Sequence, residues 1–390
     1  RHTDGGPDEG PPLAYGTGVG PVPYRTKEGM GSIVARNLQD SPVKLSCRNV
    51  WKIYGDNPAQ FFSGGNGKVD DPETHAQAIR DSGHIVASAD VSFDVREGEI
   101  VVIMGLSGSG KSTMVRCLSR LVEPTAGEVL LDGDDLLRKS DAELIEIRRH
   151  KMGMVFQSFG LLPHLNVIEN IAFPLKLQGV PVAERKARAE KVIALVGLEG
   201  REDSYPRQLS GGQQQRVGIA RSLAVEPDLW FLDEPFSALD PLIRRQMQDE
   251  FLRIQEMLHK SIVFITHDFL EALRIADRMM IMRDGLVVQM GTPAELIVNP
   301  ADDYVAEFTS DVPITRVLTA GDVVDRSRKP TARMPRVDHA CTVETLLGQL
   351  ASNASGVAVT GADDAAIGVA TAHGVIAALA AEPARQGDPA

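Results

Sequence analysis

The chain has 390 residues, of which 43% are hydrophobic and 24% are charged, a composition typical of a folded protein with a sizeable core. Its formal net charge of -12 argues against electrostatic binding to nucleic acid, which needs a basic surface. No apolar run approaches the ~20 residues that cross a bilayer. The length predicts one large domain and a smaller one.

The N-terminal segment is rich in Gly and Pro and has no hydrophobic period. This composition is typical of disorder, so we expect residues 1–42 to lie outside the fold. Met30 precedes the first periodic segment, and we therefore expect translation to begin near Met30.

From Val43 onward, short β-rich runs alternate with helical patterns. The predicted strands are 44–50, 99–105, 127–133, 151–157, 228–235, 261–267 and 278–285. The predicted helices are 111–121, 141–150, 183–198, 211–225 and 241–259. Alternation of this kind predicts buried, largely parallel strands with crossover helices, an α/β nucleotide-binding architecture.

A glycine-rich loop follows the predicted strand 99–105. Gly105, Gly110, Lys111 and Ser112 satisfy the pattern G-x-x-x-x-G-K-[ST] between a strand and a helix. Backbone N–H groups of such a loop, together with the helix N-terminus, favour bound phosphate. We expect Lys111 to contact the β- and γ-phosphates and Ser112 to ligate Mg²⁺. The alternative is a chance Gly-rich turn, which the flanking strand and helix disfavour.

Two adjacent carboxylates end the apolar run "DLWFLDEP". Asp233 is the candidate Mg²⁺ ligand, and Glu234 is placed to polarise an attacking water. Taken alone, the pair is as easily interpreted as the cap of a following helix. The phosphate loop favours the catalytic interpretation.

The segment "QLSGGQQQRVGIARSLA" predicts a helix that begins at Ser210. Ser210 and Gln213 have capping-box spacing. Gly211 and Gly212 weaken the first turn and expose backbone N–H groups, which suits a second anion site. The plainer alternative is an ordinary capped helix. Because one chain already has a phosphate loop, we expect this terminus to serve the nucleotide of another copy.

Together these segments resemble the ATP-binding subunit of an ABC transporter, over roughly Val43 to Phe308. In the family's order, the similar elements are the Walker A loop (105–113), the Q-loop glutamine Gln157, the signature sequence (209–213), Walker B with the catalytic base (Asp233, Glu234), the D-loop (237–240) and the switch histidine His267. The resemblance implies a RecA-like α/β core, an antiparallel β subdomain and a helical signature subdomain within residues 43–310.

The resemblance also implies how ATP and Mg²⁺ are bound. The implied ATP contacts are Tyr54, Gly105, Ser107, Gly108, Gly110, Lys111, Ser112, Thr113, Gln157, Asp233, Ser210, Gly211, Gly212, Gln213 and Asp240. The implied Mg²⁺ ligands are Ser112, Gln157 and Asp233. Lys111, Gln157, Glu234 and His267 are the implied catalytic residues, in a head-to-tail homodimer that encloses two ATP molecules. Tyr54 is the weakest assignment, because a tyrosine at a strand end often only packs in a core.

A long interval between Tyr54 and Glu99 narrows the resemblance to the importer ATPases for glycine betaine, proline and choline. Members work peripherally at the cytoplasmic face of the inner membrane, with permease subunits and an extracytoplasmic substrate-binding protein. The implied permease groove lies beside the Q-loop, at 158–175. Alternatives are a methionine or polyamine importer, or a soluble ABC ATPase that has no membrane partner.

The C-terminal part changes composition after Thr309. Residues 341–382 are expected to form helix, strand, turn, strand and helix, similar to half of a CBS-domain pair, with 383–390 as a tail. Residues 311–340 are expected to be a linker or a degenerate first repeat. Five basic residues and no acid lie in 326–336, which suits anionic lipid headgroups, although a solvated linker is the plainer interpretation.

Overall fold

The computed structural model describes residues 41–62, 66–156, 159–310, 312–361 and 364–380. The predicted N-terminal segment therefore lies almost wholly outside the described residues, as do Met30 and the tail 383–390. The chain divides into two compact units. The smaller unit contains Thr319–Val375, and the larger one contains the described residues before Thr319 together with the end of the last helix, from Ile376.

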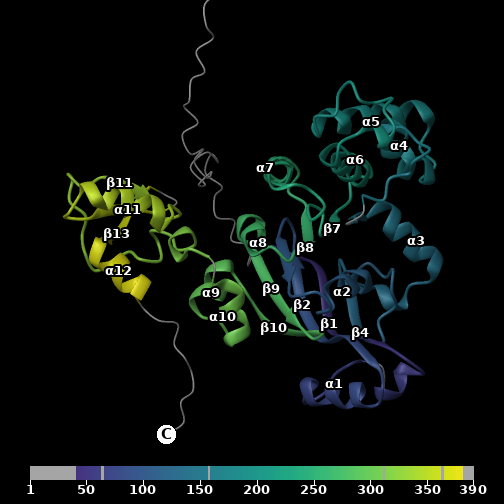
Figure 1. Ribbon diagram of the computed structural model, residues 1–390, viewed down its shortest axis with the longest axis horizontal. Coiled ribbons are helices and arrows are strands. Elements are labelled where there is room, and N and C mark those ends of the chain that lie inside the picture. The colour runs from purple at the N-terminus through teal and green to yellow at the C-terminus, as the bar shows by residue number, and fades with distance from the viewer. Residues whose placement is uncertain (1–40, 63–65, 157–158, 311, 362–363, 381–390) are drawn as a thin grey trace, which may run out of the picture. The chain divides into compact units, whose positions relative to one another are not determined.

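A six-stranded sheet of order β10-β9-β3-β8-β7-β6 forms the core of the large unit (Figure 1). Its strands are β3 (Ile100–Met104), β6 (Met152–Val155), β7 (Leu229–Asp233), β8 (Ser261–Ile265), β9 (Arg278–Arg283) and β10 (Leu286–Gly291). All neighbours pair in parallel except β9 and β10. Because β3, β8 and β7 are parallel neighbours, their carboxyl ends meet at one edge of the sheet, where the chain continues into Gly105, Thr266 and Glu234.

Side chains of the sheet alternate between two hydrophobic clusters, one on each face, and β3, β7 and β8 are buried along their whole length. Val101, Ile103 and Phe231 face the cluster that contains helix α2 (Lys111–Leu118). Val102 and Phe264 face the cluster that contains the remaining core helices. These are α4 (Val167–Leu177), α5 (Val182–Leu195), α6 (Gly211–Leu223), α7 (Pro241–Leu258), α8 (Phe269–Ile275), α9 (Pro293–Val298) and α10 (Asp303–Thr309).

An antiparallel sheet of order β2-β1-β4-β5 packs on the α2 side. Its strands are β1 (Val43–Tyr54), β2 (Ile85–Arg96), β4 (Ala126–Leu131) and β5 (Asp134–Asp135). The long interval after Tyr54 contains a short 3-10 helix (Pro58–Phe61) and α1 (Pro72–Asp81) before β2 begins. These two elements cover the fully buried Trp51, whose indole N–H donates to the Gly67 carbonyl at 2.7 Å.

A helical group projects from the core between β6 and β7 (Figure 1). It contains α4 (Val167–Leu177), α5 (Val182–Leu195) and α6, and it is preceded in the chain by α3 (Asp141–His150). The predicted α/β core, antiparallel β subdomain and helical subdomain are thereby confirmed. Within the described part of the chain, no helix combines the length and the apolar composition that a bilayer crossing needs.

The small unit is built on a three-stranded sheet of order β11-β12-β13. Its elements are β11 (Arg336–Asp338), α11 (Val343–Ser352), β12 (Val357–Thr360), β13 (Ala366–Ala370) and α12 (Ala372–Ala380). The helix, strand, turn, strand, helix order predicted after Cys341 is present. Residues before it also take part, because β11 pairs in parallel with β12 and Asp325 bridges to Val369.

Candidate functional site

The glycine loop runs from the end of β3 to the start of α2, as the sequence predicts. Gly105 has φ 148° and Gly110 has φ 99°, conformations that other residues rarely adopt. A Cβ on Gly105 would lie 2.2 Å from the Met282 carbonyl oxygen, and one on Gly110 would lie 2.0 Å from that of Ala87. Close backbone packing therefore requires glycine at both positions.

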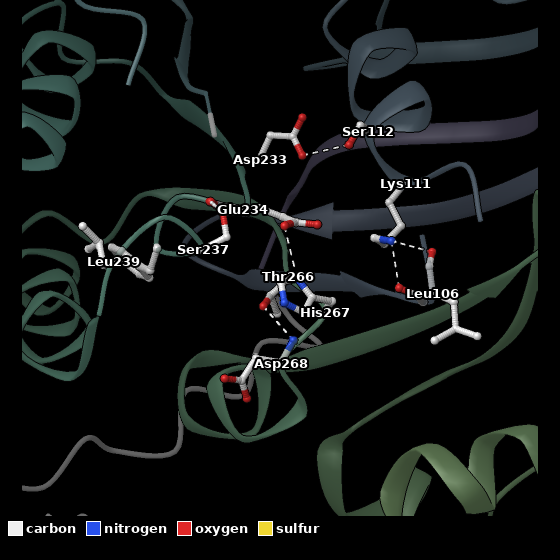
Figure 2. Close-up of polar contacts among 12 residues, drawn as sticks. Leu106, Lys111, Ser112, Asp233, Glu234, Ser237, Leu239, Thr266, His267 and Asp268 are labelled. Carbon is white, nitrogen blue, oxygen red and sulfur yellow. Dashed lines mark hydrogen bonds and ion pairs between the residues drawn. The ribbon is translucent and has the colours of Figure 1, made fainter. Parts of the chain in front are cut away.

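Lys111 is the first residue of α2 and is only 6% exposed. Its ammonium donates to the carbonyl oxygens of Gly105 at 2.8 Å and Leu106 at 2.9 Å, so it lies within the loop (Figure 2). Burial lowers the pKa of Lys111, while the nearby charges of Glu234 and Asp233 oppose this effect. A cation held this way is available to a phosphate group by exchange of its carbonyl partners.

The fold brings Ser112 of the glycine loop next to Asp233 at the end of β7. The Ser112 hydroxyl donates to Asp233 Oδ1 at 2.9 Å, although 121 residues separate them (Figure 2). Burial raises the pKa of Asp233, while the hydrogen bond from Ser112 and the charge of Arg116 lower it. One hydroxyl and one carboxylate oxygen are ligands that suit Mg²⁺, which takes its other ligands from water and phosphate.

Glu234 and His267 follow the ends of β7 and β8. Nδ1 of His267 lies 3.1 Å from Oε2 of Glu234 (Figure 2). Glu234 has φ 46°, a left-handed conformation that is uncommon for this residue type, and its N–H donates to the Ile265 carbonyl at 3.0 Å. Strained backbone of this kind is often found at functional sites.

The signature segment lies on a different element. Ser210 caps α6, and the capping box is complete: the Ser210 hydroxyl accepts from the Gln213 N–H at 3.3 Å, and Gln213 Oε1 accepts from the Ser210 N–H at 3.0 Å. Gly211 is exposed, but Gly212 is buried where a Cβ would lie 2.6 Å from Ile243 of α7. Figure 1 shows α6 with α4 and α5, apart from α2. The structure thus leaves the exposed α6 terminus separate from the glycine loop of its own chain.

The remaining predicted residues lie on several different elements. Tyr54 ends β1 and is 43% exposed, with Lys52 Nζ 4.8 Å from its ring centre. Asp240 caps α7 by accepting from the Ile243 N–H at 3.1 Å. Ser107 and Gly108 lie in the glycine loop, and Thr113 lies in the first turn of α2. Gln157 lies outside the described residues.

Arg244 is a residue that the sequence analysis missed. It lies in the first turns of α7 and contacts the turn after Glu234. A positive charge near a helix N-terminus interacts unfavourably with the helix dipole. The three carbonyl acceptors of Arg244 offset this cost.

A glycine loop of the phosphate-binding pattern, beside oxygen ligands suited to Mg²⁺, places the chain in the class of P-loop nucleotide-binding proteins. The family model described as ABC transporter matches residues 88–237. The chain is 52% identical over 324 residues to the trimethylamine N-oxide transport system ATP-binding protein TmoW of Pelagibacter ubique (strain HTCC1062), covering 83% of this chain and 94% of that protein. It is 50% identical over 285 residues to the glycine betaine/proline betaine transport system ATP-binding protein ProV of Escherichia coli (strain K12), covering 73% and 70% respectively.

Among solved structures, the dimeric post-hydrolysis state of the ATP-binding cassette MJ0796, bound to ADP and Pi, is similar at 34% identity and a TM-score of 0.53. That match covers 64% of this chain and 98% of the other. The chain belongs to the ATP-binding proteins of ABC transporters, which are ATPases coupled to transport.

Proposed function

We propose that Lys111, Ser112, Asp233, Glu234 and His267 form the hydrolytic site for ATP. The observation that carries this proposal is their convergence at one sheet edge, with Ser112 2.9 Å from Asp233 and His267 3.1 Å from Glu234. Lys111 contacts the β- and γ-phosphates, Glu234 accepts a proton from the attacking water, and His267 contacts the γ-phosphate. Ser112 and Asp233, with Gln157 as a further ligand, would hold Mg²⁺, which would neutralise phosphate charge.

The complete site is proposed to form between two copies in a head-to-tail dimer. Ser210, Gly211, Gly212 and Gln213 of one copy then face the phosphates held by the other copy, while Tyr54 stacks on adenine and Asp240 lies near the dimer contact. The exposed α6 terminus supports this arrangement, because its N–H groups have no phosphate loop of their own chain beside them.

The transported solute is proposed to be a small methylated amine of the osmoprotectant class, such as glycine betaine, proline betaine, choline or trimethylamine N-oxide. The names of the two relatives described above support this class. Permease subunits and an extracytoplasmic substrate-binding protein complete the importer, which places this chain at the cytoplasmic face of the inner membrane.

A groove of about 510 Å³ is proposed to receive a permease helix. Its apolar lining includes Phe156, Leu162, Phe173 and Leu177. Three arginines also line it: Arg148, Arg149 and Arg221. An amphipathic helix with acidic side chains matches this combination of apolar floor and positive charge.

The small unit is proposed to be a regulatory module of the CBS type, and the basic residues of 326–336 to contact anionic lipid. Support for the lipid contact comes from the exposure of Arg326, Arg328, Lys329, Arg333 and Arg336.

Uptake of radiolabelled glycine betaine, choline and trimethylamine N-oxide in cells with Glu234→Gln, against wild type, tests the proposed function. We expect uptake of at least one solute to be lost, because the variant removes the proton acceptor with little change in shape. Unchanged uptake of all three would overturn the substrate class, and unchanged ATP hydrolysis by the purified variant would overturn the role of Glu234.

A further inference from the structure

Arg244 binds the turn that follows Glu234. Its Nε donates to the Phe236 carbonyl at 3.2 Å. Its Nη2 donates to the carbonyls of Ser237 at 3.3 Å and Leu239 at 3.2 Å. The same turn begins at Glu234, since the Ser237 hydroxyl donates to the Glu234 carbonyl at 3.0 Å. The Arg244 side chain therefore donates hydrogen bonds to three carbonyls of the turn that begins at Glu234.

The other side of the Arg244 guanidinium faces the segment that carries His267. Arg244 Nη1 lies 3.6 Å from Asp268 Oδ2. Asp268 follows His267 directly and caps α8, where its Oδ1 accepts from the Glu271 N–H at 3.1 Å. Figure 2 shows Ser237 and Leu239 to one side of Glu234, and Asp268 on the turn below His267.

A guanidinium is suited to this position because it presents five N–H donors in a rigid plane. Lys has a single ammonium, which cannot reach three carbonyls and a carboxylate at once. The turn also needs support, since Glu234 is held at φ 46°. Conformations of this kind persist only where surrounding contacts impose them.

We propose that Arg244 is a positioning residue that holds Glu234 and His267 at their facing distance, by bridging the turn after Glu234 to the segment after His267. This inference rests on the proposed function of those two residues. Arg244 acts through them and does not itself touch the nucleotide.

The rest of the contact between α7 and α8 does not depend on Arg244. Gln248 Nε2 donates to Glu271 Oε1 at 2.8 Å, and Arg274 contacts both Gln248 and Asp249. These bonds keep the two helices together when Arg244 is replaced. Substitution is therefore expected to loosen the bridge without unfolding the unit.

The test is steady-state ATP hydrolysis by the purified full chain carrying Arg244→Ala, Arg244→Lys or Asp268→Asn. Arg253→Ala is the matched control, because Arg253 lies on the same helix but contacts Glu250 and the Leu195 carbonyl. Asp268→Asn removes the charge that faces Arg244 while keeping a side chain that caps helices well.

For Arg244→Ala we expect kcat to fall roughly tenfold to a hundredfold, with the KM for ATP within about twofold of wild type, because small displacements of reacting groups reduce rate more than binding. Arg244→Lys is expected to recover only part of the loss, and Asp268→Asn to lose about threefold to tenfold in kcat. The double variant Arg244→Ala, His267→Ala is expected to be scarcely slower than His267→Ala alone, because the bridge acts through that contact.

Wild-type kcat in both Arg244→Ala and Asp268→Asn would overturn the inference, as would equal losses in Arg244→Ala and Arg253→Ala. Fully additive losses in the double variant would also overturn it, since a merely structural role predicts them. The Glu234→Gln variant distinguishes failure of the proposed function from failure of the positioning role. Full hydrolysis by Glu234→Gln would overturn the proposed function. If Glu234→Gln is inactive but Arg244→Ala hydrolyses ATP at the wild-type rate, only the positioning role of Arg244 is overturned.

Discussion

Lys111 shows how a single side chain can be both structural and functional. Its ammonium bridges two carbonyls of its own loop, which keeps the loop folded around the place where phosphate is expected. A lysine buried without such acceptors would lose its charge more readily. The loop and the cation therefore hold each other in place.

Replacement of Lys111 by Ala is expected to abolish hydrolysis and weaken ATP binding. The variant removes the cation aimed at the phosphates, and groups of this kind commonly contribute about a hundredfold or more to rate. Hydrolysis rate and binding of a fluorescent ATP analogue are the measurements. A Lys186→Ala variant, which removes an exposed lysine of α5 whose ammonium faces Glu190, controls for loss of charge. Hydrolysis at the wild-type rate in Lys111→Ala would contradict the assignment.

Glu271 provides a pH-dependent test of the α7–α8 contact. Burial raises the pKa of the Glu271 carboxyl, so the folded chain holds this proton more tightly than the unfolded chain does. Its contribution to stability is therefore present below the unfolded pKa and is lost as the pH rises through the raised pKa. Glu271→Gln lacks this titration and can still accept from Gln248.

We expect the free energy of unfolding of wild type, relative to Glu271→Gln, to decrease as the pH rises from about 4, near the ordinary pKa of a glutamate, toward neutrality. Urea denaturation of the two proteins across this range is the measurement. A difference that does not change with pH would show that the carboxyl titrates alike in the folded and unfolded chains.

Among the helices, α6 has an N-terminus with two roles, helix capping and the proposed binding of the partner's phosphate, and one variant can separate them. The capping box at Ser210 stabilises the helix, and removal of such a cap by Ser210→Ala is expected to cost about 1 kcal/mol. Ser210→Asp retains a good cap but adds a negative charge where the partner's phosphate is proposed to bind.

We therefore expect Ser210→Asp to unfold at nearly the wild-type temperature and yet to lose ATP-dependent dimerisation and most of its hydrolysis. Thermal unfolding and light scattering with ATP are the two measurements, made in a Glu234→Gln background so that ATP persists. If Ser210→Asp forms dimers at the same ATP concentrations as the protein without this substitution, α6 does not face a phosphate.

In the molecule as a whole, all the described residues of the proposed hydrolytic site lie before Thr319, in the large unit. Removal of residues 319–390 is therefore expected to leave basal hydrolysis intact. If the small unit senses ionic strength, salt titrations of transport-coupled hydrolysis will differ between the full and shortened chains. Coincident titration curves would exclude that regulatory role.

The basic residues of 326–336 also allow a direct measurement. Replacement of Arg326, Arg328 and Lys329 by Gln is expected to weaken binding to vesicles of anionic lipid by about 1 kcal/mol per charge removed. Vesicle sedimentation at low and high salt measures this change. Equal binding by both proteins would favour the solvated linker.

Much of the fold and of the site could be predicted because the responsible signals are local. The glycine loop is defined by positive φ at Gly105 and Gly110, and the α6 terminus by a capping box of four residues. Apolar runs of strand length identified β3, β7 and β8. In each case the physical requirement is met by residues a few positions apart, so it is visible in the linear order of the chain.

Other features required the tertiary structure, because they join residues that only the sheet brings together. The 2.9 Å bond between Ser112 and Asp233 depends on the placement of β3 near β7, and the bridge by Arg244 depends on the packing of α7 against α8. The helix α1 in the interval after Tyr54 is a further case, since its apolar face is meaningful only against Trp51. Spacing along the chain was therefore enough to predict the glycine loop, the α6 cap and the strands β3, β7 and β8. Which distant side chains meet could not be predicted in this way, because it depends on strand order and helix packing.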